Sequence, residues 1–219
     1  THFGGFFLFS LIFIVCMENF SMIMVAFITG VLGPVSVMYV KHRLEKRKKK
    51  PDIVMDTLRV SELVDQKIEH IKEEFDADRV WISQFHNGGN FYPTGKSIAK
   101  FSIMYEVVGM NTPSVQTNFK NIPVNLFSKS INELLVNDVI GIEDFKDEKT
   151  PTFGLKYIAE ESGCKSAYLF AIKTIEDKFI GVLSVEYTRE IKKLDMESIN
   201  HLQVHASSIG GVLMSYLQQ

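Results

Sequence analysis

The sequence predicts an α+β protein, an antiparallel sheet backed by helices, with an N-terminal transmembrane region. Residues 22–40 form a run of 19 residues without a charge, about the length that spans a bilayer core as a helix. Residues 165–172 and 179–187 are rich in β-branched and aromatic residues and flank a short turn, which predicts a β-hairpin. Residues 195–217 repeat apolar residues at helical spacing, so we expect this terminal helix to cover the sheet.

The transmembrane region is expected to occupy residues 1–40, with one span at 22–40 and a second at 3–17. The first apolar stretch is only 15 residues long and is followed by the polar residues 18–21. It is either the first helix of a membrane hairpin, which we favour, or a helix lying against the membrane face. Gly30, Gly33 and Pro34 should kink the span at 22–40, and such residues are tolerated in membrane helices. A cleaved signal peptide is disfavoured, because no basic residues precede the apolar stretch.

A basic segment follows the apolar region directly. Residues 41–50 (KHRLEKRKKK) contain seven Lys and Arg residues and one acid, within a juxtamembrane linker at 41–55. Such a run marks the cytoplasmic side of a membrane helix, so we expect the domain at 56–219 to face the cytoplasm, most simply from a bacterial inner membrane. The run is either an ordinary topology signal or a binding site for anionic lipid head groups, with the residues Lys41, Arg43, Lys46, Arg47 and Lys48.

Charge and cysteine content disfavour two classes of protein. The whole chain has a formal net charge of −2, and because seven of its basic residues lie in 41–50, the rest of the chain is distinctly acidic. Binding to nucleic acid needs a basic surface, so we expect no nucleic-acid partner. Cys16 and Cys164 lie in different environments, so no disulfide framework is predicted.

The soluble domain should begin with an amphipathic helix near Asp56. Val60, Leu63, Val64, Ile68, Ile71 and Phe75 recur at helical spacing, with acids and lysines opposite. We expect this stripe to pack on the sheet beside the terminal helix, for which Asp195 is the expected N-cap. The alternative is that the stripe serves self-association as a parallel dimer.

The middle of the chain supplies the remaining elements. A strand is expected at 79–85, followed by a turn at 86–89, where Asn-Gly and Gly-Gly accept positive φ. In a second strand at 98–108, alternation predicts one buried face formed by Ala99, Phe101, Ile103, Tyr105 and Val107. Further on we expect a helix at 123–135, a strand at 139–142 and a helix at 152–162 that ends at Gly163.

The order of these elements, with Gly163–Ser166 entering a strand, the segment Phe179–Val185 and the capped final helix, resembles a GAF domain over about residues 56–217. The resemblance implies a module that binds small molecules and dimerises; it names no cofactor. It places a pocket between the sheet and the loops, away from the two long helices. The ligand-binding residues that this implies are His86, Asn87, Tyr92, Tyr105, Phe127 and Tyr168. The alternative for His86 and Asn87 is that they hold the shape of the turn.

Catalytic and metal-binding motifs are not found in the sequence. Among the six histidines only His201 and His205 share a helical face, which we expect to be solvated, so no metal site is predicted. Cys164 lies where some GAF domains carry a redox-active cysteine, but we expect a buried, inert thiol. No nucleotide-binding or kinase signature is present.

We therefore expect no enzyme, but a membrane-anchored regulatory or interaction module that acts through a small ligand or a protein partner and through self-association, as a homo-oligomer in contact with membrane lipid. The segment Phe85–Gly89, with Tyr92, Gly95 and residues 100–102, is also similar to GAF-like domains of membrane proteins from tailed bacteriophages. The alternative function is therefore a structural or lysis-related, holin-like membrane protein that uses the fold only for oligomerisation.

Overall fold

The computed structural model describes residues 22, 24–47 and 53–217, and the chain divides into two compact units at residues 1–51 and 52–219. The expected span at 3–17 and Lys48 lie outside the described residues. In the first unit, residues Met24–Arg43 form a helix long and apolar enough to cross a membrane, with a mean hydropathy of 1.6. It includes a π-helical turn, η1 (Ile28–Leu32), and continues as α2 (Gly33–Arg47), so the basic residues up to Arg47 are helical.

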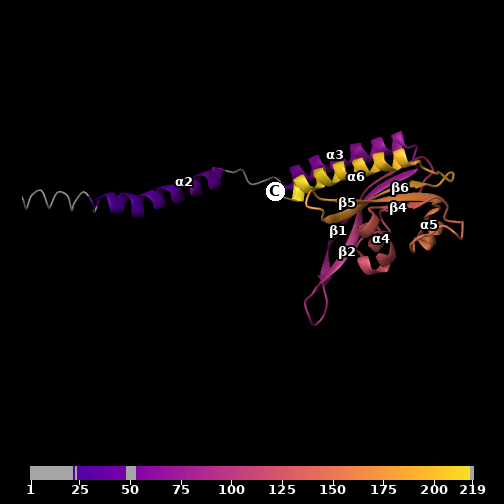
Figure 1. Ribbon diagram of the computed structural model, residues 1–219, viewed down its shortest axis with the longest axis horizontal. Helices are drawn as coiled ribbons and strands as arrows, with labels where there is room; N and C mark the ends of the chain where they lie inside the picture. Colours follow the sequence, from indigo (N-terminus) through magenta and orange to yellow (C-terminus); the bar gives the residue numbers. More distant parts are fainter. Residues whose placement is uncertain (1–21, 23, 48–52, 218–219) are drawn as a thin grey trace, which may run out of the picture. The chain divides into compact units, whose positions relative to one another are not determined.

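A six-stranded antiparallel sheet forms the centre of the second unit. The strand order is β3-β2-β1-β6-β5-β4, so the first strand lies beside the last. The long helices lie on one face of this sheet and the short helices on the other (Figure 1). The described domain is therefore α+β, as predicted. The strands are β1 (Arg79–Asn90), β2 (Ser97–Val108), β3 (Ile122–Pro123), β4 (Val139–Ile142), β5 (Ser166–Lys173) and β6 (Phe179–Tyr187).

The hairpin of β1 and β2 differs from the prediction in two ways. Residues 86–89 do not turn but continue β1 to Asn90, and His86 pairs with Lys100 across the hairpin. Ile82 pairs with Tyr105 whereas Ser83 pairs with Ile103, which leaves Met104 as an extra residue in β2. Such a β-bulge reverses the side-chain alternation along a strand. The single buried face predicted for 98–108 is therefore wrong, because the residues on either side of Met104 face opposite ways.

The helices α3 (Ile53–Glu74) and α6 (Met196–Leu217) cover one sheet face. Their apolar stripes enclose the larger core, which includes Val64, Ile68, Leu202 and Ile209, so the predicted packing of both helices on the sheet is confirmed. Asp195 caps α6, because its Oδ1 accepts a hydrogen bond of 2.8 Å from the Ser198 N–H.

Two adjacent glycines in α6 have different surroundings. A Cβ at Gly210 would overlap the backbone carbonyl oxygen of Lys173, whereas a Cβ at Gly211 would meet no atom within 4 Å. The close approach of α6 to the end of β5 therefore requires glycine at 210 and not at 211.

The second sheet face is covered by α4 (Ser128–Asn137) and α5 (Lys156–Ser162). The helix expected at 123–135 is instead a 3₁₀ turn, η2 (Val124–Phe127), that leads into α4, and the helix expected at 152–162 begins only at Lys156. Gly163 ends α5 in the left-handed conformation with φ of 69°, as predicted.

Asp78, just before β1, joins this strand to the segment after β6. Its carboxylate is buried and accepts hydrogen bonds from the N–H groups of Thr188 (2.7 Å) and Arg189 (2.8 Å) and from the Arg189 guanidinium. Burial raises the pKa of this carboxyl, but the hydrogen bonds and the charge of Arg189 outweigh burial and hold its pKa below the ordinary value.

Candidate ligand-binding cavity

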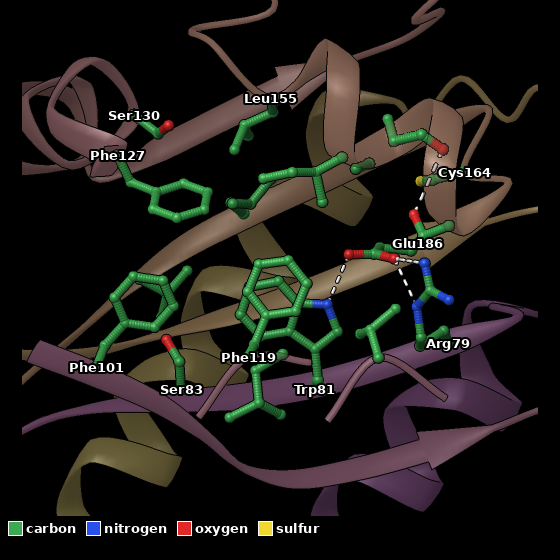
Figure 2. Close-up of a pocket in the computed structure, with 18 of the residues that line it drawn as sticks. Arg79, Trp81, Ser83, Phe101, Phe119, Phe127, Ser130, Leu155, Cys164 and Glu186 are labelled. Atoms are coloured by element: carbon green, nitrogen blue, oxygen red, sulfur yellow. Dashed lines mark hydrogen bonds and ion pairs between the residues drawn. The ribbon is translucent and has the colours of Figure 1, made fainter. Parts of the chain in front are cut away.

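A cavity lies between the sheet and the layer formed by α4, α5 and the loop before β3. The sheet supplies side chains from β1, β2, β5 and β6, and the loop supplies Val115 and Phe119. Figure 2 shows aromatic rings at one end, Arg79, Glu186 and Cys164 at the other, and Trp81 between them. The residues at its wall include Ser83, Phe101, Ile103, Phe127, Ser130, Leu134, Leu155, Ala159, Ala167, Leu169 and Val182.

The aromatic end is built from β2, η2 and the loop. Phe101 and Phe127 meet edge to face with ring centroids 5.2 Å apart, and Phe119 and Phe127 are 6.2 Å apart. The loop is held by the Glu106 carboxylate, which accepts a hydrogen bond of 2.8 Å from the Val115 N–H. Rings in such an arrangement offer an apolar wall with faces and edges against which a further ring can pack.

The polar end is a buried ion pair with a full set of partners. Arg79 is 0% exposed, and its Nε donates to Glu186 Oε2 at 2.7 Å while its Nη1 donates to the Pro113 carbonyl at 2.8 Å. Glu186 Oε1 accepts from Trp81 Nε1 at 2.6 Å and from Ser184 Oγ at 3.2 Å. The two charges therefore neutralise each other inside the wall, and the cavity as a whole presents no net charge.

Cys164 closes the polar end as a buried thiol, as predicted. Its Sγ donates a hydrogen bond of 3.2 Å to the Ser166 carbonyl. Burial raises the pKa of this thiol, and the charge of Glu186 raises it further, against the smaller effect of Arg79. The nucleophile in cysteine chemistry is the thiolate, and the raised pKa keeps Cys164 in the thiol form. Cys164 therefore contributes an unreactive, apolar sulfur atom to the cavity wall.

The size of the cavity limits what fits. Its volume is about 80 Å³. This is more than the roughly 10–15 Å³ that a cavity needs to hold one water molecule, and less than the roughly 150 Å³ of an engineered protein cavity that binds benzene. An aromatic ring therefore fits only when the side chains around the cavity move apart slightly.

The structure does not bring the six sequence-predicted ligand residues together. Phe127 lines the cavity, but Tyr105 and Tyr168 pack into the core on the opposite sheet face. For Tyr105 the reason is the β-bulge at Met104. Tyr168 accepts a hydrogen bond of 2.9 Å from the Leu194 N–H and so fixes the entry to α6.

The remaining three predicted residues lie along the far end of the β1–β2 hairpin. His86 Nε2 is 2.9 Å from Ser102 Oγ, and Asn87 Oδ1 accepts from Ser97 Oγ at 3.0 Å. Tyr92 is 97% exposed. These hydrogen bonds agree with the alternative that His86 and Asn87 hold local structure, although they join two strands rather than shape a turn.

Sequence reasoning missed the ion pair and, apart from Phe127, the phenylalanines that define the cavity. Arg79 and Glu186 are separated by 107 residues, and only the pairing of β1 with β6 places them opposite each other. The sequence did contain one signal. Arg79 begins one apolar strand and Glu186 lies near the end of another, and charged residues in buried strands require a partner of opposite charge.

No family model and no curated protein matches the chain, so its similarity to known proteins is one of structure alone. A far-red cyanobacteriochrome photoreceptor superposes with a TM-score of 0.57 at 15% identity, covering 85% of this chain and 99% of that one. The described domain has a GAF-like fold. The blue-light absorbing form of the PixJ GAF domain from Thermosynechococcus elongatus gives a TM-score of 0.58 at 14% identity, covering 75% and 91%. The phycocyanobilin-bound GAF domain of a cyanobacterial phytochrome gives 0.57 at 18%, covering 76% and 94%.

Proposed function

We propose that this protein is a membrane-anchored regulatory module whose GAF-like domain binds a small uncharged molecule in the cavity between the sheet and α4 and α5. The observation that carries the proposal is the cavity itself, an apolar, aromatic-walled space next to a self-neutralised ion pair. A charged ligand would have to leave its hydration shell without gaining a free counter-charge, which is unfavourable. A neutral ring with one hydrogen-bonding edge matches the lining.

The role is one of binding rather than catalysis. Arg79 and Glu186 are engaged with each other, and the raised pKa of Cys164 keeps its thiol protonated. No group at this wall is therefore poised as a nucleophile or a general base near neutral pH. Ligand binding would act on partners by changing the spacing of α4, α5 and the loop against the sheet.

The phytochrome domain binds phycocyanobilin, but this molecule does not fit the cavity of the present chain. That molecule is an open-chain tetrapyrrole, and a cavity of about 80 Å³ is too small for it. We expect a ligand of one ring.

The anchor is proposed to be the helix Met24–Arg43, with the cytoplasm on the side of the basic residues. Lys41 and Arg43 are exposed at its end and, with Lys46, Arg47 and Lys48, would contact anionic lipid head groups. Leu58 and Leu63 are 58% and 49% exposed on the first half of α3, which favours self-association through this helix in a homo-oligomer.

The test uses Trp81, the only tryptophan in the chain, as the reporter. The full chain in detergent is titrated with adenine, benzamide and phycocyanobilin, while Trp81 fluorescence and the melting temperature are recorded. Benzamide, a one-ring probe, should at 100 times its Kd stabilise the protein by about 2.7 kcal/mol, or roughly 5–10 °C for a domain of this size, and adenine, with two rings, should bind more weakly. Phycocyanobilin should give no shift.

A matched pair of substitutions locates the binding. Ala159→Leu fills the cavity from α5, whereas Ala99→Leu adds the same bulk at an exposed position of β2. We expect Ala159→Leu to weaken probe binding at least tenfold without lowering the melting temperature, and Ala99→Leu to leave binding unchanged. Equal binding by the parent and by Ala159→Leu would contradict the proposal. If the surroundings of Ala159 were well packed and left no cavity, the added leucine side chain would instead destabilise the protein by about 1–3 kcal/mol.

A further inference from the structure

Three side chains able to bind a metal converge on the opposite sheet face from the cavity, where the end of α3 meets α6. Glu74 Oε1 lies 3.1 Å from His201 Nδ1, and Glu74 Oε2 lies 3.2 Å from His205 Nε2. The ligand atoms of these three residues all lie within 4.8 Å of one another. His70 is close by, with its Nε2 3.6 Å from Glu74 Oε2.

The docking of the two long helices creates this cluster. His201 and His205 are one helical turn apart and share a face of α6, and Glu74 is the last residue of α3. A hydrogen bond of 2.8 Å from Lys67 Nζ to Ser208 Oγ fixes the antiparallel register of the helices. The expectation that the two histidines form a solvated face is wrong for His205, whose side chain is only 17% exposed and turns toward α3.

Phe75 supports the two imidazoles. Its ring meets His201 edge to face with centroids 5.8 Å apart, and it meets His205 at 6.2 Å. Phe75 is itself 8% exposed and belongs to the core between the helices and the sheet. The rings of the two histidines are therefore packed on one side, which restricts the directions in which their nitrogens point.

The ligand atoms lie close enough together to reach tetrahedral zinc coordination after small side-chain rotations. With Zn–N and Zn–O bonds of roughly 2.0–2.2 Å, neighbouring ligand atoms in a tetrahedron lie roughly 3.3–3.5 Å apart. The two Glu74 contacts, at 3.1 and 3.2 Å, are made by different carboxylate oxygens, and one ligand atom from each residue lies within 4.8 Å of the others. Small side-chain rotations would therefore bring one Glu74 oxygen and the two imidazole nitrogens to this spacing. Two imidazoles and one carboxylate suit zinc and its neighbours, whereas Mg²⁺ and Ca²⁺ prefer oxygen ligands alone.

We propose that Glu74, His201 and His205 bind a divalent first-row transition metal, of which Zn²⁺ fits best, and that this ion clamps the C-terminal end of α3 to α6. The fourth position is taken by water or, after a small rotation, by His70. The ion would thus hold together the helix pair that covers one sheet face. This site is separate from the cavity and does not depend on the proposed ligand.

The experiment uses the untagged full chain in detergent, stripped with a chelator and then titrated with Zn²⁺ by calorimetry, with Mg²⁺ as a second arm. We expect one Zn²⁺ per chain, a rise in melting temperature, and no heat with Mg²⁺. The variants His201→Gln, His205→Gln and Glu74→Gln should each weaken Zn²⁺ binding by about 100-fold or more, since loss even of an outer-shell partner weakens metal binding by roughly 10–100-fold. His42→Gln, on the exposed surface of α2, is the matched histidine control and should bind as the parent does.

A second readout keeps the test independent of how well the variants fold. Co²⁺ bound in place of Zn²⁺ should give the visible absorption of a four-coordinate ion, and the double variant His201→Gln/His205→Gln should lose it. The proposal is overturned if the parent binds no Zn²⁺, if Co²⁺ shows only the spectrum of a six-coordinate aqueous ion, or if the folded double variant binds Zn²⁺ as tightly as the parent.

Discussion

The buried pair of Arg79 and Glu186 makes the sharpest quantitative prediction. Glu186→Gln keeps the shape of the side chain and its capacity to accept hydrogen bonds from Trp81 and Ser184, but it removes the negative charge. Arg79, which is 0% exposed, then remains as a buried cation without a counter-charge. Arg79→Met is the reciprocal change and leaves Glu186, 8% exposed, without its cation.

The expected magnitude follows from burial. Removing one partner of a buried ion pair lowers the free energy of unfolding by about 3–5 kcal/mol, whereas replacing both partners with neutral residues is far less destabilising. The double variant should therefore lose less stability than either single variant, and far less than their sum. This non-additivity identifies charge isolation, rather than lost packing, as the cause.

Urea unfolding of the full chain in detergent, followed by Trp81 fluorescence, measures the effect. With an m value of roughly 2 kcal/mol/M, a loss of about 4 kcal/mol moves the midpoint by roughly 2 M. Glu176→Gln, which breaks an exposed pair with Lys178, is the matched control and should leave the midpoint unchanged. Additive losses in the double variant, or a midpoint shift in Glu186→Gln no larger than in Glu176→Gln, would refute the reasoning.

Three further predictions concern the same domain. Gly211→Ala should raise the unfolding free energy by up to about 1 kcal/mol, because alanine has the higher helix propensity. Gly210→Ala should lower it by about 1–3 kcal/mol, because the added Cβ forces α6 away from β5. Equal effects of the two substitutions in thermal melts would contradict the close approach of α6 to β5. In a Cys16→Ser background, Cys164 should react with iodoacetamide at pH 8 only after unfolding, and rapid labelling of the folded protein would show that its thiol is not buried with a raised pKa. Because Asp78 has a lower pKa in the folded than in the unfolded state, its stabilisation is complete above about pH 4 and is lost as the pH falls through the folded pKa. Asp78→Asn should therefore lower the unfolding free energy by about 1–3 kcal/mol at pH 7, with the difference shrinking in acid; a difference that stays constant down to the acid transition would argue against it.

The regular spacing of apolar residues predicted those helices and strands that bury one continuous stripe of side chains. The helices α3 and α6 and the strands β5 and β6 repeat apolar residues over many positions, so their type and packing could be read from the sequence. The β-bulge at Met104 could not, because it depends on pairing with β1. It moves Tyr105 to the helix side of the sheet and leaves Phe101 facing the cavity.

The candidate sites were harder to predict because each is assembled from distant segments. Arg79 and Glu186 meet only through strand pairing, and Glu74 meets His205 only when α3 docks on α6. The His86–Gly89 segment, which has the local pattern of a turn, instead extends β1 to Asn90. For this chain the fold was encoded locally and the chemistry was encoded in tertiary contacts.

A density map of the full chain, purified from cells that produce it, tests directly whether the cavity between the sheet and α4 and α5 holds a ligand. We expect non-protein density of one ring between Trp81 and Phe127, and we expect it to disappear in Ala159→Leu. A map in which the side chains around Trp81 close over the space, with no density in the parent protein, would contradict it.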